Sequence, residues 1–233
     1  MEANAQTTDW KKQIENLPKP SARPILTDKD FARMEADKKL RAHYETADAL
    51  WRSNSGVRVR HRIAPASTCE PWNKLLRRLT KRVGTGFLAA LIGNRGTGKS
   101  QLAVELIRAS CASERRAVYT TAMDIFIDLR DAYKLQESER SVLLRFQSPS
   151  LLVIDEAQER GETPWEDRML TALIDYRYSQ KRDTVLISNL KRAEFEASMG
   201  ASVISRMVEA GGIIECNWPS FRKSKTARGV GNN

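Results

Sequence analysis

The sequence predicts an α/β fold in which helices cover both faces of a central parallel sheet. Five short runs are apolar at consecutive positions, as expected of strands that are buried on both faces. These runs are 87–92, 117–121, 150–155, 184–188 and 212–216. The segments between them carry apolar residues at helical spacing. Strands that alternate with helices along a chain indicate a parallel sheet inside a three-layer fold.

The helices of this predicted fold begin with recognisable patterns. Thr163, Pro164 and Glu166 resemble a capping box, in which a threonine precedes the helix and an acid stands at its third position. Thr121 and Asp124 form a weaker version of the same pattern. Apolar spacing predicts further helices at 71–83, directly after Ser100, and in the segment before Gly211.

The first 62 residues are polar, with few apolar side chains. Pro18–Pro24 is rich in chain-breaking residues and predicts a linker. Thr27 with Asp30 resembles a capping box and predicts a helix that ends near Trp51. Its apolar stripe is thin, so we expect it to pack on another surface or to bind a partner. The predicted organisation is a helical N-terminal region with a connector at 1–62, the α/β domain at 63–223 and a basic tail at 224–233.

Composition limits the classes of protein that fit. Hydrophobic residues make up 41% of the 233 residues, which is enough for a packed core. No run approaches the roughly 18 apolar residues of a membrane span, and no secretory signal is recognisable. The three cysteines are widely spaced, which argues against a zinc site or a disulfide framework. We therefore expect a cytoplasmic protein without a membrane partner.

The net charge of +10 is concentrated outside the middle of the chain. Lys74–Arg82 holds five basic residues and no acidic one, and the end of the chain from Arg222 adds four more. Such clusters favour polyanionic partners, but a solvated surface explains either cluster equally well.

Residues 93–100 match the pattern G-x-x-x-x-G-K-[ST] of a phosphate-binding loop. An apolar run precedes the loop and a helical pattern follows it, which is the context that such a loop requires. Its glycines turn backbone N–H groups toward the phosphates, its lysine contacts the β- and γ-phosphates, and its serine hydroxyl binds Mg²⁺. The predicted nucleotide-binding residues are Gly93, Asn94, Arg95, Gly96, Thr97, Gly98, Lys99, Ser100 and Gln101.

Three further elements fit the chemistry of nucleotide hydrolysis. Asp155 ends an apolar run, where its carboxylate would lie near Mg²⁺, and Glu156 follows to orient or deprotonate the attacking water. Asn189 ends the next run and would position water or the γ-phosphate, although an ordinary strand-ending turn explains it nearly as well. Arg206 lies on a predicted short helix, and from spacing alone it is equally well a surface arginine.

These four elements, in this order, resemble those of an AAA+ ATPase. The segment "ISRMVEAGGIIECNWPSFRK" (204–223) is similar to the end of replicative-helicase loaders of the DnaC/DnaI type. In that family an arginine finger lies in the S-R-M segment, and an N-W-x-S-[YF]-R motif closes the domain. The IstB-type transposition ATPases are the sister group. The resemblance covers roughly 53–223.

The resemblance implies an AAA+ P-loop fold without a full helical lid, and an ATPase that uses ATP with Mg²⁺. It assigns Ser100 and Asp155 to the metal, and Glu156 to the activation of water. Asn189 matches sensor 1, Arg206 matches a finger supplied to a neighbouring subunit, and Arg222 matches a sensor-2-like arginine.

The resemblance also implies single-stranded DNA contacts at Arg130, Tyr133 and Trp165, where an arginine binds phosphate and aromatic rings stack on bases. Simple packing explains the two aromatic residues almost as well. The implied function is an ATP-dependent loader that self-associates and places a hexameric DnaB-type helicase on a single strand. Such a protein acts in a bacterial cell and is encoded by the host or by a phage.

Two other functions stay open at this point. An IstB-like ATPase would assemble on duplex DNA and regulate transposition. An adaptor would use ATP only as a structural ligand, but the Asp155–Glu156 pair argues against it. The N-terminal region separates the helicase loader from the IstB-like ATPase, because the thin stripe between Phe31 and Leu50 favours a helix that grips a helicase. Residues 1–50 carry no family motif, so another partner is also open.

Overall fold

The structure is a computed structural model that describes residues 38–53, 57, 69–161 and 163–222. The predicted linker at Pro18–Pro24, the predicted helix start at Thr27 and the predicted tail at 224–233 lie outside these residues. Within the described part of the chain, no helix is long and apolar enough to cross a membrane.

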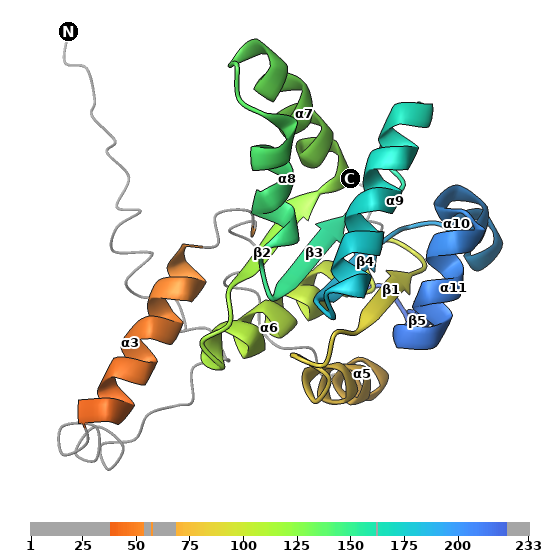
Figure 1. Cartoon of the computed structure of the whole chain (residues 1–233). Coiled ribbons are helices and arrows are strands. Elements are labelled where there is room, and N and C mark those ends of the chain that lie inside the picture. Colours follow the sequence, from red (N-terminus) through yellow and green to blue (C-terminus); the bar gives the residue numbers. More distant parts are fainter. Residues whose placement is uncertain (1–37, 54–56, 58–68, 162, 223–233) are drawn as a thin grey trace, which may run out of the picture.

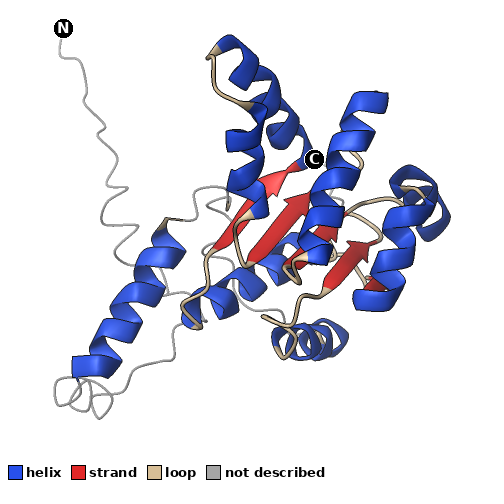
Figure 2. Ribbon diagram, viewed as in Figure 1, coloured by secondary structure: helices blue, strands red, loops and turns tan. Residues whose placement is uncertain are grey.

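Five parallel strands form the centre of the molecule, which confirms the predicted fold class (Figure 2). Every strand lies within one residue of its predicted run. The strands are β1 (Leu88–Ile92), β2 (Ala117–Thr121), β3 (Leu151–Asp155), β4 (Asp183–Ile187) and β5 (Gly212–Glu215). Their order in the sheet is β2-β3-β4-β1-β5. Every residue of β1, β3 and β4 is buried, which is why these strands are apolar at nearly every position.

Alternate residues of β1 point into two separate cores, one on each face of the sheet. Leu88, Ala90 and Ile92 face the larger core. The helices of that core are α7 (Ala122–Lys134), α8 (Glu139–Gln147), α9 (Pro164–Ser179), α10 (Arg192–Met199) and α11 (Ala201–Ala210). Ala89 and Leu91 face the other core, which is covered by α5 (Glu70–Thr80) and α6 (Lys99–Ala112).

The N-terminal helix α3 (Lys38–Arg52) lies beside α6 and not against the sheet (Figure 1). Leu50 and Trp51, near its end, pack against the core that contains α6. The Arg108 guanidinium of α6 lies over the Trp51 ring, 4.7 Å from the ring centroid. The last turns of α3 therefore use the α/β domain as their packing surface.

The helix starts predicted at Thr121 and Thr163 are present, with one difference. The Thr121 and Thr163 hydroxyls accept backbone N–H groups of Asp124 (3.1 Å) and Glu166 (3.3 Å), as N-caps do. The Glu166 side chain does not complete a capping box, however, because it is buried and pairs with Arg130. Sequence analysis did not identify α8 and α10, since each is short and buries only two side chains; these are Val142 and Phe146 in α8, and Phe195 and Met199 in α10.

Arg177 of α9 is an arginine with 0% of its surface exposed. Its guanidinium donates to the Thr184 hydroxyl (2.9 Å) and to the carbonyls of Phe146 (2.9 Å), Pro149 (2.9 Å) and Asp183 (2.5 Å). Burial lowers the pKa of Arg177 to about 9, which leaves it protonated at neutral pH. This one side chain therefore ties α9 to the end of α8, the turn before β3 and the start of β4.

We expect the substitution Arg177→Leu to lower the free energy of unfolding by about 3–5 kcal/mol, because it leaves several buried carbonyls without a donor. Urea denaturation followed by circular dichroism measures this change. Arg116→Ala is the control, since Arg116 is exposed and its removal should change stability by no more than about 0.5 kcal/mol. A loss of less than about 1 kcal/mol for Arg177→Leu would contradict this role.

Candidate active site

The topology of the sheet brings the phosphate loop, Asp155 and Asn189 to one edge. Because the strands are parallel, the segments that follow β1, β3 and β4 leave the sheet on the same side. β1 leads into the phosphate loop, β3 ends at Asp155, and Asn189 follows β4. Since β4 lies between β1 and β3, Asn189 follows the strand that separates the loop from Asp155.

The phosphate loop needs its glycines for two reasons. Gly93, Gly96 and Gly98 have left-handed backbones, with φ of 118°, 88° and 79°. A Cβ atom at Gly96 would also lie 2.1 Å from the Ser220 hydroxyl, and one at Gly98 would lie 2.7 Å from the Phe221 ring. Helix α6 begins directly after Gly98, so its positive N-terminal end adjoins the loop.

Two tryptophans and the C-terminal segment fasten this loop. The Trp72 indole of α5 donates to the Gly98 carbonyl (3.1 Å), and the Trp218 indole donates to the Thr97 carbonyl (2.7 Å). The backbone N–H of Phe221 donates to the Gly96 carbonyl (2.8 Å). Sequence analysis did not identify this role for Trp72, because a tryptophan on an amphipathic helix is indistinguishable from an ordinary core residue.

Lys99 lies at the base of the loop and is buried. Its ammonium donates to the carbonyls of Gly93 (2.6 Å) and Asn94 (2.8 Å). Burial lowers the pKa of Lys99, and the nearby positive charge of Arg222 adds to that effect. A bound phosphate would attract the same ammonium and favour its charged form. This arrangement fits a lysine that changes partners from loop carbonyls to a nucleotide.

A pair of hard oxygen ligands lies next to Lys99. The Ser100 hydroxyl donates to Asp155 Oδ2 (2.8 Å), and the Tyr119 hydroxyl of β2 donates to the same oxygen. Among the described residues, no group of three or more His, Cys, Asp or Glu side chains can hold a metal ion. Ser100 and Asp155 nevertheless fit Mg²⁺, because this ion binds one or two protein oxygens together with phosphates and water.

Glu156 follows Asp155 in an uncommon backbone conformation, with φ of 53°. Its N–H donates to Asp155 Oδ1 (2.8 Å), and the N–H of Ala157 donates to the Ile187 carbonyl of β4 (2.9 Å). The Glu156 side chain is half-buried. The turn after β3 therefore carries a partly accessible carboxylate at the residue that directly follows Asp155.

The other predicted residues of this edge differ in their surroundings. Arg95 is mostly exposed, and its guanidinium lies 3.7 Å from the Glu159 carboxylate. The buried Gln101 side chain donates to Glu105 Oε1 (3.0 Å), one turn further along α6. Asn189 is half-buried. Arg222 is exposed at the loop, and its Cγ would lie 3.4 Å from a Cβ at position 96.

Arg206 is not brought to the phosphate loop of its own chain. Its Nε lies 3.2 Å from Asp175 Oδ1, and its guanidinium carbon lies 5.7 Å from the centroid of the Tyr178 ring. Both partners belong to the last turns of α9. Because α9 connects two parallel strands, it runs back from the site edge, and its last turns lie toward the opposite edge of the sheet.

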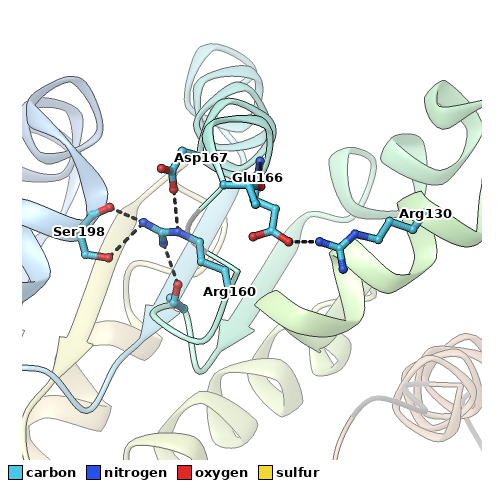
Figure 3. Close-up of polar contacts among 7 residues, drawn as sticks. Arg130, Arg160, Glu166, Asp167 and Ser198 are labelled. Carbon is cyan, nitrogen blue, oxygen red and sulfur yellow. Dashed lines mark hydrogen bonds and ion pairs between the residues drawn. The ribbon is translucent and has the colours of Figure 1, made fainter.

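The three residues assigned to DNA by resemblance lie on α7 and at the start of α9. The Arg130 guanidinium is half-exposed and pairs with the buried carboxylate of Glu166 (Figure 3). The partly buried Trp165 ring packs against Phe126, with 6.0 Å between ring centroids. Tyr133 belongs to α7, but its side chain lies outside the described part of the structure.

Comparison with known proteins identifies the family. The family described as IstB-like ATP binding protein matches residues 85–228. The chain belongs to this family. The matched region contains the phosphate loop, the Asp155–Glu156 pair and the closing segment to Arg222, and family membership supports nucleotide binding by this chain.

Relatives of this IstB-like protein include helicase loaders, which confirms the predicted resemblance. Replicative helicase loader DnaC from Escherichia coli strain K12 is 29% identical over 147 residues, or 61% of this chain and 60% of that protein. The similarity thus spans about three-fifths of the length of that curated relative.

Solved structures show the shared AAA+ fold. The crystal structure of the DnaC helicase loader matches with a TM-score of 0.55 and 19% identity, over 72% of this chain and 98% of that one. AMPPCP-bound DnaA from Aquifex aeolicus matches with a TM-score of 0.57 and 15% identity, over 68% of this chain and 50% of that one.

Tyr119 is a residue of this site that sequence analysis did not identify, because a tyrosine in an apolar strand resembles a core residue. We expect Tyr119→Phe to weaken nucleotide binding in the presence of Mg²⁺ by about 10- to 100-fold, because its hydroxyl orients the Asp155 carboxylate. Titration with a fluorescent ATP analogue measures this affinity. Binding without Mg²⁺ should change little, and an equal loss with and without Mg²⁺ would contradict a role through the metal site.

Proposed function

We propose that this protein is an ATP-dependent loader of a DnaB-type hexameric helicase onto single-stranded DNA. Binding and hydrolysis of ATP control its assembly with the helicase and its release. The observation that carries the ATPase part is the contact between Ser100, which follows Lys99 in the chain, and Asp155, which precedes Glu156. The loader part is supported by the similarity to replicative helicase loader DnaC.

In this proposal each residue of the site has a separate task. Lys99 exchanges its carbonyl partners for the β- and γ-phosphates, and Ser100 and Asp155 hold Mg²⁺, which neutralises charge on the phosphates. Glu156 accepts a proton from the attacking water, and Asn189 orients that water. Arg222, which is exposed at the loop, contributes positive charge near the phosphates.

Arg206 completes the site of a neighbouring subunit. Its position toward the opposite edge of the sheet prevents it from acting on its own nucleotide, and it is partly exposed. A guanidinium that stabilises charge on the γ-phosphate of a neighbour makes hydrolysis dependent on self-association. The chain therefore works as an oligomer through AAA+ interfaces.

Residues 1–62, including α3, bind the helicase in this proposal, residues 63–223 bind ATP and DNA, and residues 224–233 form a basic tail. Arg130, Tyr133 and Trp165 contact the single strand. The ion pair between Arg130 and Glu166 would have to open, or Arg130 would have to contact phosphate through its remaining N–H groups.

Size-exclusion chromatography with a DnaB-type hexameric helicase and ATP tests this function. We expect a stable complex that dissociates as ATP is consumed, after the helicase is placed on a single strand. Glu156→Gln should bind ATP normally, lose turnover and trap the complex, because an amide cannot accept a proton from water. Lack of any complex with the wild-type chain would contradict the loader function, and an unchanged ATPase rate for Glu156→Gln would contradict the role of Glu156.

The second candidate function is an IstB-like ATPase that assembles on duplex DNA and regulates transposition. It is favoured by the family match over residues 85–228. Filter binding to matched single-stranded and duplex oligonucleotides in the presence of ATP separates the two functions. Preference for the single strand supports the loader, and ATP-dependent coating of the duplex supports the alternative.

A mixing experiment tests the action of Arg206 across an interface. Arg206→Ala should bind ATP but lose most activity, since such an arginine contributes about 10³- to 10⁵-fold in related enzymes. Lys99→Ala should lose ATP binding and keep its finger. We expect the mixture to regain part of the ATPase activity, because an intact finger can then face an intact pocket. Co-assembly of the two inactive variants without any recovery would show that Arg206 does not act on a neighbour.

A further inference from the structure

Arg160 belongs to the turn between β3 and α9, and its side chain is only 5% exposed. One guanidinium nitrogen, Nη1, donates to the Ala157 carbonyl (2.9 Å), and Nε donates to Asp167 Oδ1 (2.8 Å). The other nitrogen, Nη2, donates to the Ser198 carbonyl and lies 3.1 Å from the Ser198 hydroxyl. As Figure 3 shows, a single side chain therefore joins the turn after β3, the start of α9 and the end of α10.

The contact with Ala157 bears directly on Glu156. A left-handed backbone is unfavourable for a glutamate, so the surrounding contacts must maintain it. Asp155 fixes the N–H of Glu156, and β4 fixes the N–H of Ala157. The Glu156 carbonyl accepts the N–H of Glu159 (2.8 Å), and Arg160 fixes the Ala157 carbonyl. Without Arg160, Glu156 and Ala157 keep these three contacts but lose the one at the Ala157 carbonyl, which is the contact that joins the turn to α9 and α10 through a side chain.

The contact with Ser198 connects Arg160 to the helix that precedes the one carrying Arg206. Ser198 is in the last turn of α10, where a guanidinium complements the negative end of the helix. Gly200, with φ of 78°, follows and separates α10 from α11. Arg206 lies on α11, so the positions of the Ser198 carbonyl and of Arg206 are connected through one short hinge and a helix.

We propose that Arg160 is a positioning residue that holds the Glu156 turn in its active geometry and links this turn to the helix that carries Arg206. The inference rests on the proposed function, in which Glu156 activates water and Arg206 acts on a neighbouring nucleotide. None of the Arg160 hydrogen bonds in the described part of the structure is with the phosphate loop. Arg160 therefore affects the rate of hydrolysis and not the affinity for ATP.

Steady-state ATPase kinetics of the full chain test the first part. Arg160→Ala should lower kcat by about 10- to 100-fold and leave KM for ATP unchanged, because a displacement of about 1 Å in a reacting group has an effect of this size. Arg168→Ala is the matched control, since Arg168 is an exposed arginine of the neighbouring helix α9 and should keep the wild-type kcat. An unchanged kcat for folded Arg160→Ala would overturn the proposal.

A second variant keeps the proposal testable if Arg160→Ala does not fold. Asp167 is 52% exposed, so Asp167→Ala removes the partner that orients Arg160 with little effect on the core. It should lower kcat less than Arg160→Ala does, and the double variant should be no slower than Arg160→Ala alone. Thermal melting of each variant shows whether it is folded. If Arg160→Ala does not fold, an unchanged kcat for Asp167→Ala overturns the proposal instead.

Mixed assemblies test the link to Arg206. The mixture of Arg206→Ala and Lys99→Ala subunits is prepared again with Arg160→Ala added to one of the two. It is added either to the Arg206→Ala subunit, which supplies the pocket, or to the Lys99→Ala subunit, which supplies the finger. We expect the ATPase activity that mixing restores to be lower in both cases. A fall only in the pocket-supplying subunit would overturn the link to α11. A wild-type chain without ATPase activity would contradict the proposed function, whereas an active wild type with an equally active Arg160→Ala would contradict this inference alone.

Discussion

The carboxylate of Asp155 is the point on which the arrangement of the candidate site depends. One of its oxygens accepts the hydroxyls of Ser100 and Tyr119, and the other accepts the N–H of Glu156. Three elements, α6, β2 and the turn after β3, are therefore held to one buried group at the tip of β3. This is possible only because the strands are parallel, so that their carboxyl ends share an edge.

Two buried arginine side chains stabilise opposite ends of the helical layer that contains α9. Arg177 satisfies the carbonyls around the entry to β3 and β4, and Arg160 satisfies those of the turn after β3 and the end of α10. A guanidinium suits both places because its N–H groups form a rigid planar fork that reaches several acceptors at once. One of them maintains the fold, and the other holds the turn that contains Glu156.

Sequence analysis predicted the sheet well, because runs such as 87–92 obey strict local constraints, and Gly93, Gly96 and Gly98 have the left-handed backbones that the loop pattern requires. It did not predict contacts that arise only when distant segments meet. Tyr119, Trp72 and Arg160 have no local signature, since a tyrosine in a strand, a tryptophan on a helix and an arginine in a turn are ordinary in isolation. The helices that it missed are short and bury only two residues each, so no apolar period marks them.

Helix α6 connects the nucleotide site to the N-terminal helix. Its first residues form the end of the phosphate loop, and a buried polar row continues along it: Gln101 donates to Glu105 (3.0 Å), and the Arg108 guanidinium lies 3.8 Å from the same carboxylate. Arg108 in turn covers the Trp51 ring of α3. The loop and the end of α3 are thus fixed to a single rigid element. A partner held by α3 would be oriented with respect to the nucleotide by these contacts, whatever path the chain takes between α3 and α5.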